Sequence, residues 1–156
     1  MLALAGAAAS LEEARRRVRD ALASGAGLRR FQQAIEQQGG DPRVCDDPAR
    51  LPAARERVEV KARTEGRVRR IACRSVGRAA MLLGAGRETV DSRIDPAVGL
   101  VLHKKVGDLV LPNEPLMTVH VNDRSRLAEA VAILEAAVEI GPEAPAAVPL
   151  VREVID

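Results

Sequence analysis

Aromatic side chains are almost absent from this 156-residue sequence: Phe31 is the single aromatic residue, and neither tryptophan nor tyrosine occurs. Proteins that bind single-stranded nucleic acids stack the bases on aromatic rings, so this scarcity weighs against nucleic acid as a partner. The hydrophobic core must be built from alanine, valine, leucine and isoleucine. The composition, 47% hydrophobic and 29% charged, is typical of a globular protein.

Cysteine is also scarce, and long apolar runs are missing. Cys45 and Cys73 have neither metal-ligand spacing nor a paired framework, which indicates reduced thiols and a cytoplasmic location. No segment approaches the roughly 20 apolar residues that cross a bilayer, so we expect no membrane partner. The net charge is +2, and this balance of signs is typical of a solvent-exposed surface.

Two short amphipathic helices are predicted near the N-terminus. Ser10 and Glu13 form a capping box, and apolar residues at helical spacing follow as far as Gly25. A second helix is predicted over residues 28–38, and the very short connection favours an antiparallel helical hairpin. Met1–Ala5 are expected to be the last turns of a helix that begins before this chain.

A proline-containing stretch, residues 41–54, has the composition of a linker. We therefore place the main boundary at its end. Residues 1–54 are predicted to form a helical segment with its linker, and residues 55–156 a separate α+β domain.

The α+β domain is expected to contain strands, two helices and a polar loop. Alternating or apolar patterns predict six strands. A short helix is predicted over residues 75–83 and a polar loop over 86–93. A second helix, capped by Asn122 or Asp123, should run to the stop at Gly141 and pack on the sheet. The predicted strands are 56–62, 68–73, 98–102, 109–111, 116–121 and 148–155.

The stretch from Ala97 to Val121 is predicted to be three strands folded back on one another. Its Lys-Val-Gly-Asp sequence, residues 105–108, resembles the hammerhead half of biotinyl and lipoyl carrier domains. Carrier domains display a modifiable lysine at a hairpin tip, but Met117 has no lysine beside it. The predicted fold class is α+β: an N-terminal helical hairpin, then a hammerhead or barrel-sandwich-like mixed sheet with packed helices.

No metal site is predicted, because His103 and His120 lie on different strands without further ligands at a suitable spacing. Two stretches are candidate phosphate sites. His103-Lys104-Lys105 lacks an accompanying glycine-rich loop, so a charged strand end is the favoured interpretation. Gly84-Ala85-Gly86-Arg87 follows a helix and lacks the third glycine of a dinucleotide fingerprint, so we expect a helix end and turn.

The remaining polar candidates are expected to be structural. Ser10 and Ser75 are predicted to be helix caps, and Cys73 to lie on a strand facing the core, where a thiol is inert. Three aspartates are expected to be isolated turn carboxylates: Asp91, Asp95 and Asp108. We therefore assign no catalytic, cofactor-binding or metal-binding residue to this chain, and no cofactor.

Several motifs occur together in one order. They are Ser10–Val44, the LGAGR, IDPAVG and HKKVGD motifs within Leu82–Asp108, and the helix after Val121-Asn122-Asp123. In this order the chain resembles the C-terminal region of pyrimidine-nucleoside phosphorylases, the thymidine phosphorylases. The resemblance implies a parent enzyme that cleaves thymidine or uridine with inorganic phosphate as co-substrate, giving the base and a (deoxy)ribose 1-phosphate.

The resemblance also implies what this chain lacks. The phosphate and pyrimidine motifs of that family, a lysine-serine-glycine-glycine loop and a later arginine, serine and lysine set, are not found here. Residues 1–54 would then end the parent's α/β domain, and the partner would be the remainder of a homodimeric parent. Two alternatives stay open: a cofactor-free hammerhead module that contacts a partner, and a nucleic-acid binder that uses the arginines.

Overall fold

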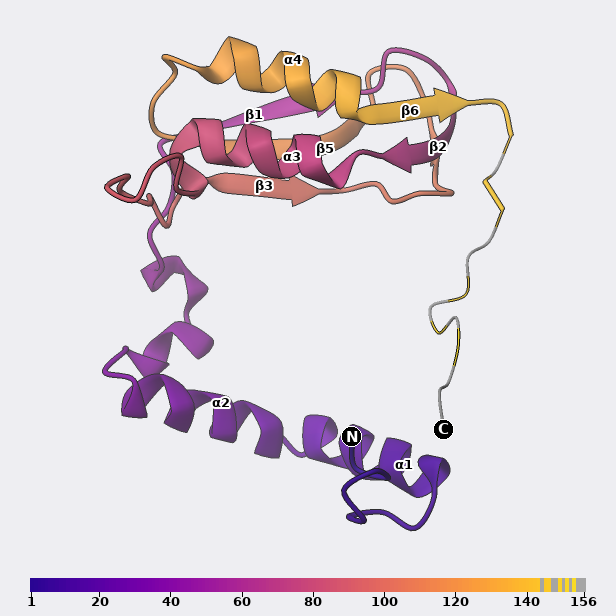
Figure 1. Ribbon diagram of the computed structural model, residues 1–156. Coiled ribbons are helices and arrows are strands. Elements are labelled where there is room, and N and C mark those ends of the chain that lie inside the picture. The colour runs from indigo at the N-terminus through magenta and orange to yellow at the C-terminus, as the bar shows by residue number, and fades with distance from the viewer. Residues whose placement is uncertain (144, 147–148, 150, 152, 154–156) are drawn as a thin grey trace. The chain divides into compact units, whose positions relative to one another are not determined.

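The computed structural model describes residues 1–143, 145–146, 149, 151 and 153. It divides into two compact units, Met1–Leu51 and Pro52–Asp156, which we call the N-terminal and C-terminal units (Figure 1). The predicted strand 148–155 falls on a stretch most of which lies outside the described residues. Within the described part of the chain, no helix has the length and apolar character needed to cross a bilayer.

The N-terminal unit contains the two predicted helices, α1 (Leu11–Ala23) and α2 (Ala26–Gln37). Ser10 caps α1, because its hydroxyl accepts a hydrogen bond of 3.1 Å from the backbone N–H of Glu13. The Glu13 carboxylate in turn accepts from the N–H of Ala9 at 2.9 Å. Two short 3-10 turns follow in the predicted linker: η1 (Pro42–Cys45) and η2 (Pro48–Arg50).

The two helices do not pack as the predicted antiparallel hairpin. They follow one another almost end to end (Figure 1), joined through Gly25, which has a left-handed φ of 70°. The apolar side chains of Leu22 and Phe31, which an antiparallel hairpin would bury between its helices, are 70% and 60% exposed. Met1–Ala5 form a hydrogen-bonded turn and not the end of a helix, with the Ala5 N–H 2.9 Å from the Met1 carbonyl oxygen.

The strands of the C-terminal unit form two three-stranded sheets, in the orders β1-β5-β3 and β4-β2-β6. All their described pairings are antiparallel, so the α+β class is confirmed, whereas the prediction of a mixed sheet is wrong. The strands 97–121 do not form one meander, because the middle one, β4, pairs with β2 in the other sheet. The strands are β1 (Glu56–Lys61), β2 (Gly66–Ile71), β3 (Gly99–Leu102), β4 (Leu109–Val110), β5 (Pro115–Val121) and β6 (Val138–Gly141).

Two helices lie side by side over the sheets (Figure 1): α3 (Cys73–Ala80), which continues into the π-helical turn η3 (Met81–Ala85), and α4 (Leu127–Ala137). The core is aliphatic, as the composition predicts. Both sheets and both helices contribute fully buried side chains, which include Val60, Val68, Ala79, Val119 and Leu134.

Helix α4 differs from its prediction at both ends. It begins at Leu127, not at a cap on Asn122 or Asp123, and no side chain caps it. It ends at Ala137, and the chain passes directly into β6, which pairs with β2. Val138 continues the helical spacing of Leu127, Val131 and Leu134, which is why the sequence pattern alone did not reveal this strand.

Candidate functional site

A polar pocket of about 460 Å³ lies in the C-terminal unit where three segments meet. The first is η3 with Gly86, and the second is the pocket loop, which we define as residues 86–95. The third is the connection between β5 and α4, residues 122–126. The lining carries the carboxylates of Glu88, Asp95 and Asp123 and the guanidinium groups of Arg93 and Arg126. This mixture of charges does not favour a bare anion.

The Gly84–Arg87 stretch shapes one wall of the pocket but does not have the geometry of a phosphate loop. Gly84 adopts φ 102°, a left-handed conformation that glycine reaches without steric cost, and it ends the helical path. Its carbonyl oxygen accepts a hydrogen bond from the N–H of Asp95 at 2.9 Å. The predicted helix end and turn are therefore confirmed.

Asp95 forms hydrogen bonds with several segments around the pocket and is not the isolated turn carboxylate that we expected. One of its oxygens accepts from the Ala97 N–H at 2.9 Å, and the other accepts from the Asn122 side-chain amide at 2.7 Å. These two bonds lower the pKa of Asp95, and the bond from the Asn122 amide has the larger effect. The Asn122 oxygen accepts from the Arg55 N–H at 2.8 Å, so the hydrogen bonds continue from Asp95 to the start of β1.

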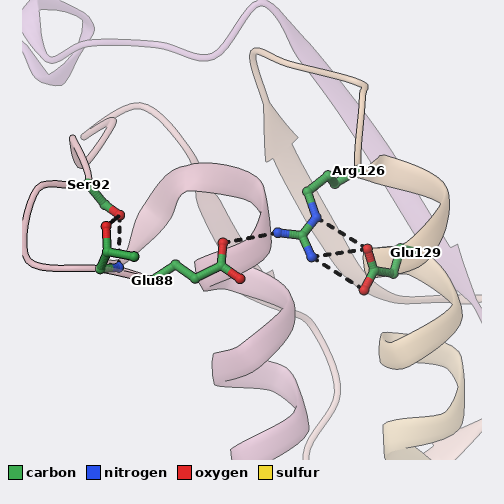
Figure 2. Close-up of polar contacts among 5 residues, drawn as sticks. Glu88, Ser92, Arg126 and Glu129 are labelled. Carbon is green, nitrogen blue, oxygen red and sulfur yellow. Dashed lines mark hydrogen bonds and ion pairs between the residues drawn. The ribbon is translucent and has the colours of Figure 1, made fainter.

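Arg126 joins the pocket loop to helix α4. Figure 2 shows its guanidinium between Glu88, at 3.1 Å, and Glu129, at 3.2 Å. The hydrogen bonds that Arg126 donates to Glu129 raise the pKa of Arg126, so the carboxylates of the protein itself hold the guanidinium. Ser92, in the same loop, lies 2.9 Å from the Thr89 hydroxyl and is used in a turn. Glu88, Asn122 and Arg126 were not predicted as pocket residues, because the contacts of Arg126 with Glu88 and of Asn122 with Asp95 join segments 38 and 27 residues apart.

Neither histidine belongs to the pocket. His103 Nε2 lies 2.7 Å from the Thr118 hydroxyl, and His120 stands in β5 opposite Gly99 and Arg57. Within the described part of the chain, no group of three or more histidine, cysteine or acidic side chains could hold a metal ion.

Lys104, weighed as a phosphate ligand, forms an ion pair with Glu114. Glu114 also accepts from the Leu111 N–H at 2.9 Å. Both bonds lower the pKa of Glu114, and the bond from Lys104 has the larger effect. Asp108 accepts from the Lys105 N–H at 2.8 Å, as expected of a turn carboxylate. The charged stretch 103–105 is therefore used to fix the turns around β4.

Two further predictions about polar residues need correction. Ser75 does not cap a helix, because α3 begins at Cys73 with Ala72 in the cap position. Cys73 is exposed at the helix start, not buried on a strand, and its sulfur lies 3.6 Å from the Ile71 carbonyl oxygen. The thiol is therefore open to solvent. Asp91 lies exposed in the pocket loop.

Comparisons with known proteins agree with the order of motifs. Residues 67–141 match the family described as "Pyrimidine nucleoside phosphorylase C-terminal domain". The chain is 42% identical over 144 residues to the pyrimidine-nucleoside phosphorylase of Staphylococcus haemolyticus, covering 92% of this chain and 33% of that protein. The Geobacillus stearothermophilus protein of that name is 49% identical over 122 residues, covering 78% of this chain and 28% of the relative. The Bacillus subtilis protein of that name is 42% identical over 146 residues, covering 94% of this chain and 34% of the relative.

The chain thus spans about a third of the length of the curated relatives that it matches. The family match includes the polar pocket, helices α3 and α4, and the strands from β2 to β6 apart from Gly66, but not β1. The resemblance predicted from the ordered motifs is confirmed: this chain carries the C-terminal domain of the pyrimidine nucleoside phosphorylases.

Proposed function

We propose that this chain is a non-catalytic, structural C-terminal portion of a pyrimidine-nucleoside phosphorylase. The whole enzyme, in the cytoplasm, would cleave thymidine or uridine with inorganic phosphate to the free base and a (deoxy)ribose 1-phosphate. As the family resemblance implies, it would act as a homodimer. The observation that carries the proposal is the similarity of nearly the whole chain to about one third of relatives with that name.

The surface of the N-terminal unit supports a role within a larger enzyme. Helices α1 and α2 leave large apolar side chains exposed along their length. Contiguous apolar surface of this kind usually marks an interface. We propose that the remainder of the parent enzyme covers it. The exposed side chains are Leu11, Val18, Leu22, Leu28 and Phe31.

The C-terminal unit supports a scaffolding role. In its pocket Asn122 donates to Asp95 and Arg126 pairs with Glu88, and neither histidine lines it. Charge stabilisation at a phosphate or a base needs free donors aimed at the substrate. We propose that the two sheets form the predicted hammerhead; the pairing of β4 with β2, and not with its neighbours in sequence, supports this. We also propose that the sheets help to fix the hinge about which the parent's cleft closes.

The direct test is an assay for release of thymine from thymidine in the presence of phosphate. The purified 156-residue chain is expected to release none, whereas the full-length Bacillus subtilis relative serves as the positive control. Thymine release by the chain alone, at a rate near that of the control, would overturn the proposal.

A second test uses the full-length relative with the region matching residues 55–156 removed. The shortened enzyme is expected to melt at a lower temperature or to turn over more slowly. Unchanged melting together with unchanged turnover would show that this region is not a scaffold.

A further inference from the structure

Three segments that are far apart in the sequence meet at one pair of side chains in the C-terminal unit. Asp95 ends the pocket loop, Asn122 directly follows β5, and Arg55 directly precedes β1. The contacts are 2.7 Å between Asn122 Nδ2 and Asp95 Oδ2, and 2.8 Å between the Arg55 N–H and Asn122 Oδ1. Asp95 and Asn122 are both half-buried.

The orientation of the Asn122 amide is dictated by Asp95. An ionised carboxylate can only accept hydrogen bonds, so it must face the NH₂ group of the amide and not its oxygen. The amide oxygen is then left pointing at the backbone N–H of Arg55, where it accepts. The carboxylate on one side, which only accepts, and the Arg55 N–H on the other, which only donates, therefore fix the amide in one orientation.

The contact lies at the open end of a strand ladder. Glu56 and Val121 form the last register pair between β1 and β5, and Arg55 and Asn122 are the next residues outward. Ladder ends fray easily, since each terminal residue has few partners. The side chain of Asn122 supplies the bond that a further rung would have made, and so holds the point where the segment 52–55 enters β1.

The same pair also holds the pocket loop. Asp95 needs one carboxylate oxygen for its own turn, where it accepts from the Ala97 N–H. Its other carboxylate oxygen accepts from the Asn122 amide, and its backbone N–H donates to the Gly84 carbonyl oxygen. Release of the Asn122 amide would therefore loosen the loop and the entry to β1 together.

We propose that Asp95 and Asn122 form a conformational clasp that couples the pocket loop to the segment entering β1. Asp95 is a positioning residue that acts on Arg55 through Asn122. This inference concerns the C-terminal unit alone and holds whether or not the chain belongs to a working phosphorylase.

The test measures hydrogen exchange of individual backbone amides in the 156-residue chain by NMR. Asp95→Asn removes an acceptor, because an amide has one oxygen for the two donors that the carboxylate satisfies. Asn122→Asp sets two carboxylates against each other. Each single variant is expected to speed exchange of the Arg55 amide by about tenfold or more, the size expected for losing a hydrogen bond to a charged network.

The double variant D95N/N122D is the decisive measurement. It reverses the direction of the central bond: the amide introduced at position 95 donates to the carboxylate at position 122, which still accepts from Arg55. Net charge is unchanged, and the oxygen at position 95 remains for Ala97. Exchange at Arg55 is expected to return to within about threefold of the wild-type rate, because every donor again has an acceptor.

Asp91→Asn is the matched control, since it makes the same chemical change within the pocket loop and should leave Arg55 exchange unchanged. Asn122→Ala covers the case in which Asp95→Asn does not fold, and it should speed exchange at both Arg55 and Asp95. Wild-type exchange at Arg55 in the foldable single variants would overturn the clasp. The clasp would also be overturned if the Arg55 amide exchanged as fast in the double variant as in the single variants.

Discussion

Gly66 lies against Gly141 so closely that a Cβ atom added at Gly66 would stand 2.7 Å from the Gly141 carbonyl oxygen. Gly141 stands opposite Arg67 in the pairing of β2 with β6, and Gly66 is the residue just before Arg67. Gly66 also has φ 151°, a conformation that side-chain-bearing residues rarely adopt. The start of β2 therefore depends on the absence of a side chain.

Gly66→Ala is expected to lower the free energy of unfolding by about 1–3 kcal/mol, the usual cost of forcing extra atoms into a packed site. Thermal unfolding followed by circular dichroism measures the effect. Gly77→Ala is the matched control, because Gly77 lies within helix α3 and a Cβ there meets nothing within 4 Å. It should stabilise the chain by roughly 0.5–1 kcal/mol. Equal effects of the two substitutions would contradict this account of Gly66.

Asn113 should tolerate glycine but not alanine. It occupies the left-handed position of the turn 111–114 with φ 69°, and its N–H donates to the Ala62 carbonyl oxygen at 2.8 Å. Asparagine and glycine accept this conformation, whereas alanine loses about 1–2 kcal/mol in it. Melting curves of Asn113→Gly and Asn113→Ala are therefore expected to separate, with the glycine variant near wild type. An alanine variant as stable as wild type would show that the turn is not strained.

Leu134 should be the more sensitive of two leucines that differ in burial. It is fully buried in α4 against both sheets, whereas Leu109 in β4 is 53% exposed. Leu134→Ala is expected to cost about 2–5 kcal/mol of unfolding free energy, and Leu109→Ala less than about 1 kcal/mol. Urea titration measures both. A smaller loss for Leu134→Ala than for Leu109→Ala would contradict the packing of α4.

The ion pair between Lys104 and Glu114 predicts a pH dependence. Bonds from Lys104 and the Leu111 N–H lower the pKa of Glu114 below its ordinary value of 4.5. A lowered pKa in the folded state means that the carboxylate stabilises the fold above about pH 4.5, and that this contribution is lost as the pH falls through the lowered value. Glu114→Gln should therefore flatten the fall in melting temperature between pH 5 and the acid range, measured by calorimetry.

The control for this titration is Glu65→Gln, which changes an exposed carboxylate in the turn between β1 and β2. It should keep the wild-type dependence on pH. If Glu114→Gln and wild type lose stability in parallel on acidification, the pair with Lys104 does not contribute.

Elements with strong local signals were predictable from sequence. The Ser10 cap and the spacing of apolar residues predicted α1, alternation predicted β1, and an apolar run between turn residues predicted β5. Strand partners were not predictable, because pairing joins distant segments: nothing local to β4 shows that it pairs with β2. The single-sheet expectation failed for this reason.

The pocket shows the same limit at the level of side chains. Gly84 carried a local signal, since a glycine after a helical pattern commonly ends the helix. Asp95 and Asn122 are 27 residues apart, and each alone looks like an ordinary turn residue. Their partnership exists because the fold brings together the end of β5 and the end of the pocket loop.

Helix α4 passes into β6 with no residue between them, since Ala137 ends the helix and Val138 begins the strand. No loop is present at this junction to absorb a change in length. One residue inserted there would turn the whole strand over, because alternate side chains of a strand point to opposite faces. Ile140 would exchange places with Glu139, leaving a charge against the core. Evolution can therefore vary the residues around this junction far more freely than it can vary their number.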